Sequence, residues 1–372
     1  MQIRIPVQSI VIIVGGRGDP IAEIAAAIEM PSAPWDINAP DASKERLRAT
    51  VKEYGRARVA MVHAHAKARS DVAAIARKHG AASIVIRLPG AAPVDGTAEK
   101  HDAVYDVTRA DQIDVTFVPM PSDRRDLAGP FDIIGDVHGV AEEFTELLDK
   151  LGYVDPSTGT LRRHPDGRTP VLLGDLTDRG PENKRSLEIA RRLGELGGLV
   201  ILGNHDHKLM RWLQGRDVRV AAGLAATIRE LEDTTPEWRA GVAAWLASLQ
   251  THLVLDRGRL VVAHAGLAEE YHGRHTSGAQ SFALYGKTVP GGGLDDDGFP
   301  LAEDWAMTYA GEATVVHGHV VHAEPRIVGN VVAIDTGAVF GGTLTAYRWP
   351  ERDFIQVAAK RVYFAASRGV RS

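Results

Sequence analysis

The stretch FDIIGDVHG, residues 131–139, ends a short apolar run with an aspartate and a histidine two positions apart. A run of this length that stops at a glycine is typical of a buried strand, and the turn after it carries two side chains that can ligate a metal ion. The signal is weak by itself, because a D-x-H sequence is more often a turn with a surface histidine. Its weight depends on whether other strands of the chain end in the same way.

Four further apolar runs do end in this way, in the turns GDLTDRG at 174–180, GNHD at 203–206, HAG at 264–266 and GH at 318–319. Before the second turn, VAEEFTELLDKLGY places Phe144, Leu147, Leu148 and Leu151 on one face of a helix, which Gly152 ends. Polar residues at the carboxyl ends of strands that alternate with helices predict a functional site along one edge of an α/β sheet.

Together these turns supply six metal-ligating side chains. They form two overlapping sets: Asp136, His138 and Asp175 for one ion, and Asp175, Asn204, His264 and His319 for another. The Asp175 carboxylate would bridge two divalent ions about 4 Å apart, which can clamp phosphate oxygens and generate hydroxide from a bridging water at neutral pH. The chain has no cysteine. Oxygen and imidazole donors suit Mn²⁺, Fe, Zn²⁺ or Ni²⁺, and of these we expect Mn²⁺.

Three more side chains in the turns have the chemistry of a reaction on phosphate. Arg179 follows the bridging carboxylate by four residues, and its planar guanidinium can bind two phosphate oxygens at once. His205 lies between Asn204 and Asp206, near the ions without having to bind one, so we expect it to be the general acid for the leaving oxygen. Asp178 would orient and charge the His205 ring.

The composition favours a protein of two domains. The chain has 372 residues, and 43 Lys plus Arg against 48 Asp plus Glu give a net charge of −5, so no general positive field attracts nucleic acid. A chain without cysteine forms no disulfides and suits a reducing compartment. The beginning of the sequence lacks a signal-peptide pattern, and no apolar run approaches the ~18 residues that cross a bilayer. We therefore expect a cytoplasmic protein with no membrane partner.

The first 120 residues are organised differently. Short β-branched runs such as SIVIIV, VAMVHA, SIVIRL and DVTFVP alternate with helical stretches and predict βαβ units around a parallel sheet. The segment PMPSDRRDLAGP at 119–130, with three prolines and four charges, is the best linker candidate.

The segment SIVIIVGGRGDPIAEIAAAIEM at 9–30 has the layout of a phosphate-binding loop between a strand and a helix. However, Pro20, Ile21 and Ala22 stand where such a loop requires glycine, lysine and a hydroxyl. Without the lysine, the β- and γ-phosphates of a nucleotide would lose their main charge partner, and Asp19 would repel them further. The loop therefore predicts no ATP chemistry.

The order GDxHG, GDxxDRG, GNHD, HAG, GH resembles the specific signature of metallophosphoesterases of the phosphoprotein-phosphatase type. More closely, GPFDIIGDVHG at 129–139 and IDTGAVFGGTLT at 334–345 resemble the phosphatase module of bacterial polynucleotide kinase-phosphatase, an RNA end-repair enzyme. The resemblance covers roughly residues 120–360 and implies the same ligands, phosphate clamp and general acid. It also implies that Asp335 supports activity from behind the ligands. A second basic residue is expected after HAG; Arg274 is the candidate phosphate contact, while Gln280 stands where an arginine is expected.

This resemblance implies an α/β fold in two domains. Residues 121–372 would form a binuclear metallophosphoesterase domain, a β-sandwich flanked by helices. Residues 1–120 would form a smaller parallel-sheet domain that is similar to a P-loop kinase but degenerate, a pseudokinase without ATP chemistry.

Three functions remain open from the sequence. The first is a phosphomonoesterase that uses a metal-bridging hydroxide on 2′- or 3′-phosphate or 2′,3′-cyclic phosphate ends of RNA or nucleotides. The second is a protein Ser/Thr phosphatase or a dinucleoside-polyphosphate hydrolase, which the motifs do not separate from the first because the ions act on the phosphorus. The third is a scaffold that recruits a protein partner through residues 1–120. The expected substrates are thus phosphorylated nucleic-acid ends, nucleotides or phosphoproteins. Basic residues at 162, 163 and 168 would favour a polyanion, although a solvated face explains them equally well.

Overall fold

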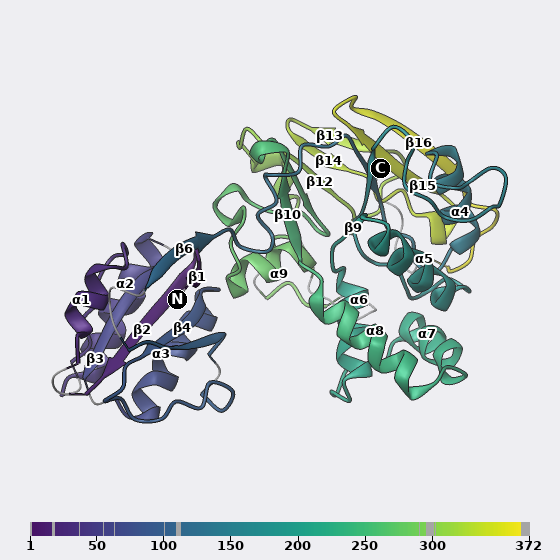
Figure 1. Ribbon diagram of the computed structural model, residues 1–372. Helices are drawn as coiled ribbons and strands as arrows, with labels where there is room; N and C mark the ends of the chain where they lie inside the picture. Colours follow the sequence, from purple (N-terminus) through teal and green to yellow (C-terminus); the bar gives the residue numbers. More distant parts are fainter. Residues whose placement is uncertain are drawn as a thin grey trace. The chain divides into compact units, whose positions relative to one another are not determined.

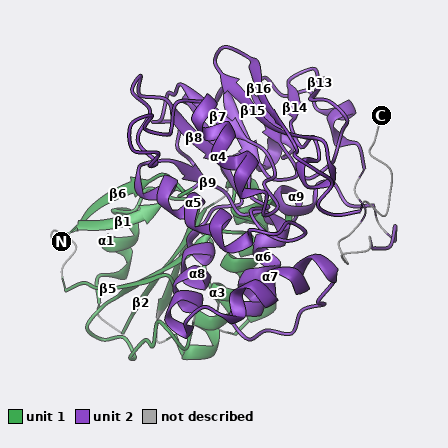
Figure 2. Cartoon of the chain, turned by 90° about the vertical axis from the view of Figure 1, so that its right-hand side faces the viewer, with its two compact units in different colours: residues 1–121, 274–279 green, residues 122–273, 280–372 purple. Residues whose placement is uncertain are grey.

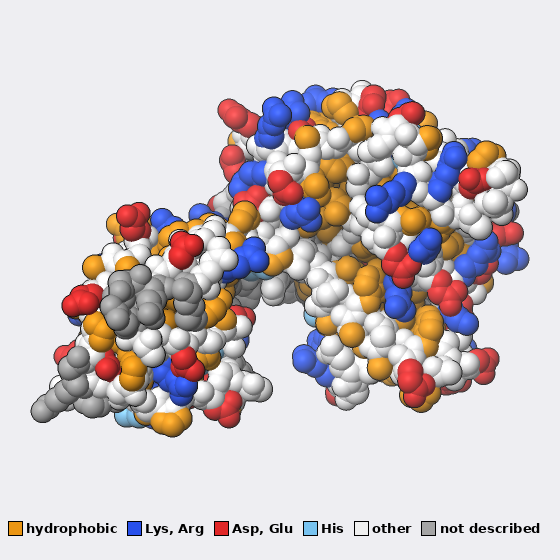
Figure 3. All heavy atoms as spheres, in the orientation of Figure 1, with side chains coloured by type: hydrophobic (Ala, Val, Ile, Leu, Met, Phe, Trp, Pro, Cys, Tyr) orange, Lys and Arg blue, Asp and Glu red, His pale blue; other side chains and the backbone are white. Residues whose placement is uncertain are grey.

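The computed structural model describes residues 2–16, 19–36, 38–54, 56–62, 64–99, 101–108, 113–289, 291–294, 301 and 303–365. The chain divides into two compact units, one made of residues 1–121 and 274–279 and the other of residues 122–273 and 280–372 (Figure 2). Within the described ranges, no helix is both long and apolar enough to cross a membrane. On the face drawn in Figure 3, acidic and basic side chains are interspersed over the surface, in accord with the small net charge of −5.

The first unit contains β1 (Gln2–Pro6), β2 (Ser9–Gly15), α1 (Ile21–Ala26), α2 (Pro40–Tyr54), β3 (Ala57–Val62), α3 (Ala66–Lys78), β4 (Ala82–Arg87), β5 (Ala103–Asp106) and β6 (Asp114–Val118). Its main sheet has four parallel strands in the order β3-β2-β4-β5. Alternate side chains of the buried strand β2 join different clusters: Ile10 packs with Leu47 of α2 and Val72 of α3, and Val11 with Ile24 of α1. Helices therefore lie on both faces of the sheet, which explains the uninterrupted apolar run of β2.

One strand expected in this sheet lies elsewhere. The segment DVTFV forms β6, which pairs in parallel with β1 in a separate two-stranded sheet. The expectation of a single sheet is wrong at this point because an apolar pattern identifies a strand but not its partner. The edge position beside β4 is taken instead by β5, whose four residues AVYD are only partly buried or exposed and give no clear apolar run.

The loop after β2 uses its backbone donors internally. An Asp19 carboxylate oxygen accepts hydrogen bonds from the backbone N–H groups of Gly16 (2.6 Å) and Gly90 (3.0 Å). Residues 17 and 18 of the loop lie outside the described ranges. A carboxylate of the chain itself thus occupies backbone N–H groups of the kind that a phosphate-binding loop offers to its ligand.

The second unit contains β7 (Phe131–Ile134), α4 (Ala141–Lys150), β8 (Thr169–Leu172), α5 (Asn183–Glu195), β9 (Leu199–Val200), α6 (Asn204–Leu213), α7 (Ala222–Glu232), α8 (Pro236–Ser248), β10 (His252–Leu255), β11 (Leu260–Ala263), β12 (Thr314–His317), β13 (Arg326–Val328), β14 (Val331–Ala333), β15 (Thr343–Trp349) and β16 (Asp353–Ala358) (Figure 1). Helix α9 (Ser277–Tyr285) begins in the segment 274–279 and ends in this unit.

The strands of the second unit form two five-stranded sheets, ordered β16-β15-β7-β8-β9 and β10-β11-β12-β14-β13. Side chains from both, including Ile133, Val171, Val262 and Val316, share one buried cluster, so the sheets pack face to face as a sandwich. The strands that precede the polar turns divide between the two sheets: β7, β8 and β9 lie in one, and β11, β12 and β14 in the other. The expectation of a site along the edge of a single sheet is therefore wrong.

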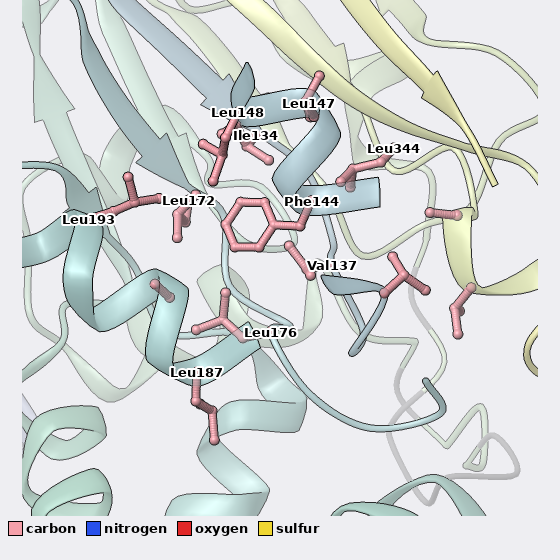
Figure 4. Close-up of a cluster of buried hydrophobic side chains, with 14 of the residues drawn as sticks. Ile134, Val137, Phe144, Leu147, Leu148, Leu172, Leu176, Leu187, Leu193 and Leu344 are labelled. Carbon is pink, nitrogen blue, oxygen red and sulfur yellow. The ribbon is translucent and has the colours of Figure 1, made fainter. Parts of the chain in front are cut away.

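Helices cover the outer faces of the sandwich. On α4, Phe144, Leu147 and Leu148 pack against Ile134 of β7 and Leu172 of β8, and Figure 4 shows the Phe144 ring inside this cluster. The apolar face predicted for residues 144–151 is thus confirmed, and Gly152, with φ of 89°, follows the end of the helix. On the other sheet, outward side chains of β11 and β12 pack with α9 and with the 3₁₀ turn Trp305–Thr308.

The segment 119–130 contains the division between the units, after residue 121. Its second part is bound to the sandwich: the Val254 N–H donates to the Ser122 carbonyl (2.8 Å), and the Arg124 N–H donates to the Val254 carbonyl (2.9 Å). Residues beyond 121 therefore extend the edge of the sheet at β10 and do not form a free linker.

Candidate metal centre and active site

The two sheets bring the ends of their motif strands together. Asp136 and His138 follow β7, Asp175 follows β8, His264 follows β11 and His319 follows β12, while Asn204 begins α6. Within each sheet these strands are parallel, so their carboxyl ends share one edge. All except His319 are at most 4% exposed.

Strained turns hold several of these side chains. A φ between 45° and 75° occurs at His138, Asp175, Asp178, Arg179 and His319. This left-handed region is uncommon for residues other than glycine and costs on the order of 1–3 kcal/mol each, so surrounding contacts must maintain it. One such contact is the Asp175 carbonyl, which accepts hydrogen bonds from the N–H groups of Val137 and His138.

Backbone carbonyls orient two of the imidazoles. His138 donates from Nδ1 to the Thr177 carbonyl (2.8 Å), and its Nε2 lies 3.5 Å from Asp175 Oδ2. His264 donates from Nδ1 to the Leu173 carbonyl (2.9 Å), and its Nε2 lies 3.3 Å from the same Asp175 oxygen. In both rings Nδ1 is thus fixed as the donor to a backbone carbonyl, and Nε2, the nitrogen that faces Asp175, is the one that could ligate a metal.

The structure contains two groups of potential metal ligands, and within each group the ligand atoms all lie within 4.8 Å of one another. One group is His138, Asp175 and His205, and the other is Asp175, His264 and His319. Asp175 belongs to both groups, which is the position that a bridging carboxylate requires. The Asn204 side-chain oxygen lies 2.7 Å from His264 Nε2 and 3.2 Å from His319 Nδ1. The Asn204 oxygen therefore faces nitrogen atoms that can also act as acceptors, and it cannot bond to them directly when they do. A cation bound between these atoms would remove the conflict, as would a rotation of the amide that makes its nitrogen the donor.

Asp136 lies beside these groups with one oxygen unpartnered. Its Oδ2 accepts a hydrogen bond from the His319 N–H (3.0 Å), whereas its buried Oδ1 has no hydrogen-bond partner among the described residues. Burial, together with the nearby Asp335 carboxylate, raises the pKa of Asp136 well above its ordinary value. An orphaned buried carboxylate oxygen is costly unless a cation satisfies it. The residues present therefore fit divalent ions that accept oxygen and imidazole ligands.

The pKa values of the imidazoles shift in opposite directions. Burial lowers the pKa of His264, but the Asp175 and Asp136 carboxylates outweigh it and raise that pKa to about 10. Burial, with the charge on His264, lowers the pKa of His319 to about 3. Burial, with the charge on Arg179, lowers the pKa of His138 well below its usual value. His138 and His319 are therefore neutral near pH 7, the form that binds metal ions.

The three residues expected to act on the substrate contact one another. His205 Nδ1 lies 2.7 Å from Asp178 Oδ2. Arg179 donates from Nη2 to His205 Nε2 (3.0 Å) and from Nη1 to His138 Nε2 (2.8 Å), and its guanidinium lies over the Phe340 ring at 5.3 Å. The guanidinium thus lies between the candidate acid and a candidate ligand, where it can meet a phosphate group.

Sequence reasoning missed residues that support this arrangement. Thr227 of α7 donates to Asp178 Oδ1 (2.6 Å), and the Asp178 N–H donates to the Asn183 side-chain oxygen (2.8 Å). Asp206 accepts from the N–H groups of Leu176 (3.0 Å) and Gly203 (3.2 Å), which ties two motif turns together. The position of Asp206 in GNHD was a usable signal, whereas nothing in the sequence around Thr227 indicates a role.

Of the two remaining candidate site residues, Asp335 lies close to the candidate metal ligand Asp136, whereas Arg274 belongs to the other compact unit. Asp335 is buried, accepts a hydrogen bond from the Gly337 N–H (3.0 Å) and lies close enough to raise the pKa of Asp136. Arg274 belongs to the first compact unit and not to the unit that carries the other candidates. Its contact with phosphate therefore stays a prediction.

The buried His317 packs against Trp305 and donates from Nδ1 to the Gly318 carbonyl (2.9 Å), apart from the two ligand groups.

The basic residues at 162, 163 and 168 precede β8, whereas Asp175 follows it. Arg168 is buried and bound by Asp132 (2.8 Å) and Glu351 (2.7 Å), so its charge is compensated within the fold. These residues consequently lie at the opposite end of the strand from the metal ligands.

Comparison with known proteins gives consistent matches. The sequence profile of the family described as "Calcineurin-like phosphoesterase" matches residues 129–323. Asymmetrical bis(5′-nucleosyl)-tetraphosphatase PrpE of Geobacillus sp. (strain WCH70) is 42% identical over 237 residues, which cover 62% of this chain and 95% of the relative. The proteins of the same name from Halalkalibacterium halodurans and Bacillus cereus are 41% and 42% identical, covering 62% and 63% of this chain and 94% and 96% of the relatives.

Proposed function

This chain belongs to the calcineurin-like phosphoesterases and is a phosphoesterase hydrolase, and we propose that it cleaves dinucleoside tetraphosphates asymmetrically. An asymmetric cut of a four-phosphate bridge leaves a nucleoside triphosphate and a nucleoside monophosphate. The names of the relatives support this alternative over the RNA-end phosphatase that the sequence favoured.

The observation that carries the proposal is the pair of ligand groups that share Asp175. We propose that Asp136, His138, Asp175, Asn204, His264 and His319 hold two divalent ions and that these are Mn²⁺. Ions held there would supply Lewis-acid stabilisation of phosphoryl oxygens and acidify the attacking water.

The chain's own residues would position the phosphate and move the proton. Arg179 is part-buried, and its two terminal guanidinium nitrogens contact the imidazoles of His138 and His205. A phosphate group that binds both of these nitrogens would move the guanidinium away from His205 Nε2. Asp178 holds the His205 ring through Nδ1. Once Arg179 has moved, Nε2 would take a proton from solvent and, in the catalytic step, give it to the leaving oxygen. In a tetraphosphate bridge that oxygen belongs to a phosphate, which leaves more readily than a sugar alkoxide.

For residues 1–120 we propose a P-loop-kinase-like fold without ATP chemistry. The parallel order β3-β2-β4-β5 supports the fold, and the bonds from Gly16 and Gly90 to the Asp19 carboxylate support the loss of phosphate binding. A recruited protein partner for this unit remains the competing proposal.

The test uses the full chain with MnCl₂ and diadenosine tetraphosphate, with products separated by anion-exchange chromatography. We expect ATP and AMP in equal amounts, and no turnover by Asp175→Asn or after chelation with EDTA. Parallel assays with 3′-AMP, 2′,3′-cyclic AMP and a phosphopeptide measure the alternatives. A higher kcat/KM for any of these, or ADP as the sole product, would contradict the proposal.

A further inference from the structure

Beside the turn that carries His264, the second unit has a pocket of about 470 Å³ that the chemistry above does not use. Its wall contains four aromatic side chains, Tyr271, Phe282, Trp305 and Tyr309. We propose that this pocket binds one nucleobase of the substrate, an inference that rests on the proposed hydrolysis of dinucleoside polyphosphates.

The aromatic rings contact one another in a row that runs from Tyr271 through Phe282 and Trp305 to Tyr309. Ring centroids lie 6.0 Å apart for Tyr271 and Phe282, 5.6 Å for Phe282 and Trp305, and 5.8 Å for Trp305 and Tyr309. Trp305 is 6% exposed and anchors the group, whereas the other three rings are half-buried and retain open surface. Base stacking on an aromatic side chain is worth about 1–3 kcal/mol and tolerates any base, because every base has a π-face.

The pocket and the metal ligands are joined through one turn. Trp305 donates from Nε1 to the Ala265 carbonyl (3.1 Å), and its ring packs so closely on Gly266 that a Cβ there would meet the ring at 2.0 Å. Ala268, which also lines the pocket, is four residues from His264, a chain distance of at most about 14 Å. A nucleoside in the pocket would therefore lie within reach of a polyphosphate bound at His264.

The charges around the pocket favour a base over a phosphate. Glu269 and Glu270 line it, are exposed, and form no ion pair with any residue in the described ranges. The Lys287 ammonium is 2.7 Å from the Glu303 carboxylate, so its charge is compensated. Carboxylates would repel a phosphate, but they accept hydrogen bonds from the amino groups of adenine, cytosine or guanine. The pocket therefore suits the base of the substrate and not its polyphosphate chain.

Equilibrium binding of AMP and of inorganic phosphate to the full chain with Mn²⁺, measured by calorimetry, tests the pocket without requiring turnover. Tyr271→Ala removes a stacking surface, and Ala310→Phe fills the pocket from an exposed position without removing any contact. We expect each to weaken AMP binding about 10-fold, which is about 1.4 kcal/mol, with phosphate affinity unchanged. Tyr271→Phe should keep the wild-type affinity. Tyr54→Ala, at an exposed tyrosine of the first unit, is the matched control.

In the hydrolysis assay, Tyr271→Ala should raise the KM for diadenosine tetraphosphate by a similar factor and leave the Ki of inorganic tetraphosphate unchanged. Absence of diadenosine tetraphosphate turnover by the wild-type enzyme refutes the proposed function, and the AMP titrations still test the pocket. AMP affinities that are equal in the wild type, Tyr271→Ala and Ala310→Phe overturn the pocket assignment, as does an equal loss of AMP and phosphate affinity. Thermal unfolding of each variant checks that it is folded.

Discussion

His205 Nδ1 lies 2.7 Å from the Asp178 carboxylate, and both side chains are at most 3% exposed. This contact fixes the ring so that Nε2 faces Arg179. If His205 is a proton donor, His205→Ala should lower kcat by about 10²–10⁴-fold for phenyl phosphate, and by much less for 4-nitrophenyl phosphate, whose leaving group needs no proton. Metal content, measured by mass spectrometry, should be unchanged. A fall in metal content would show instead that His205 is a ligand.

Arg179→Lys should weaken phosphate binding although the charge is kept. A lysine cannot present the planar pair of N–H donors that binds two oxygens, and it loses the contact with the Phe340 ring. Hydrogen bonds to charged groups are worth about 1.5–3 kcal/mol, so kcat/KM should fall roughly 10–100-fold. Inhibition by inorganic phosphate should weaken in parallel. Unchanged phosphate inhibition would remove Arg179 from the substrate site.

Gly318→Ala should damage the metal centre although Gly318 is not a ligand. A Cβ at this position would lie 1.8 Å from Asp136 Oδ1, the buried oxygen without a hydrogen-bond partner among the described residues. Asp136 must then move, and we expect at least a 10-fold loss of activity together with weaker binding of at least one ion. Gly194→Ala, whose Cβ would meet nothing within 4 Å, is the control and should retain activity. Full metal content and wild-type kcat/KM in Gly318→Ala would contradict the assignment of Asp136.

The buried Glu99–Arg69 ion pair should make the first unit sensitive to acid. Its contacts measure 2.7 and 2.8 Å, and Arg69 is 2% exposed. Burial raises the pKa of the Glu99 carboxyl, but the hydrogen bonds and charge of Arg69 outweigh it and leave that pKa below 4.5. The folded state therefore binds fewer protons than the unfolded one. The pair stabilises the fold fully above about pH 5 and loses this effect as the pH falls through the lowered pKa.

Glu99→Gln leaves Arg69 without a charged partner and should lower the free energy of unfolding by on the order of 3 kcal/mol at pH 7. Thermal unfolding between pH 7 and pH 3 should show that the difference from the wild type shrinks toward the acid end. The exposed Glu45→Gln serves as control and should change little. A difference that stays constant with pH would mean that the charge of Glu99 contributes nothing.

The residues that can carry the chemistry, and the local elements that hold them, follow from the amino-acid sequence alone. Glycine-bounded turns such as those around Asp136 and Asp175, and the spacing of apolar residues on α4, depend on a few neighbouring positions, so they can be read from a single chain. The same holds for the loop at 9–30, where the absence of the lysine is evident from the sequence alone.

How these elements combine is evident only in the folded chain. The division of the motif strands between two sheets, the pairing of β6 with β1, and the bond from Thr227 to Asp178 all join residues distant in the sequence. Local apolar patterns are the same whichever strand lies alongside, because partner choice depends on how faces pack and not on the pattern within one strand. For the same reason the aromatic pocket beside His264 arises from segments at 268–271, 282 and 305–310 that meet only when the chain is folded.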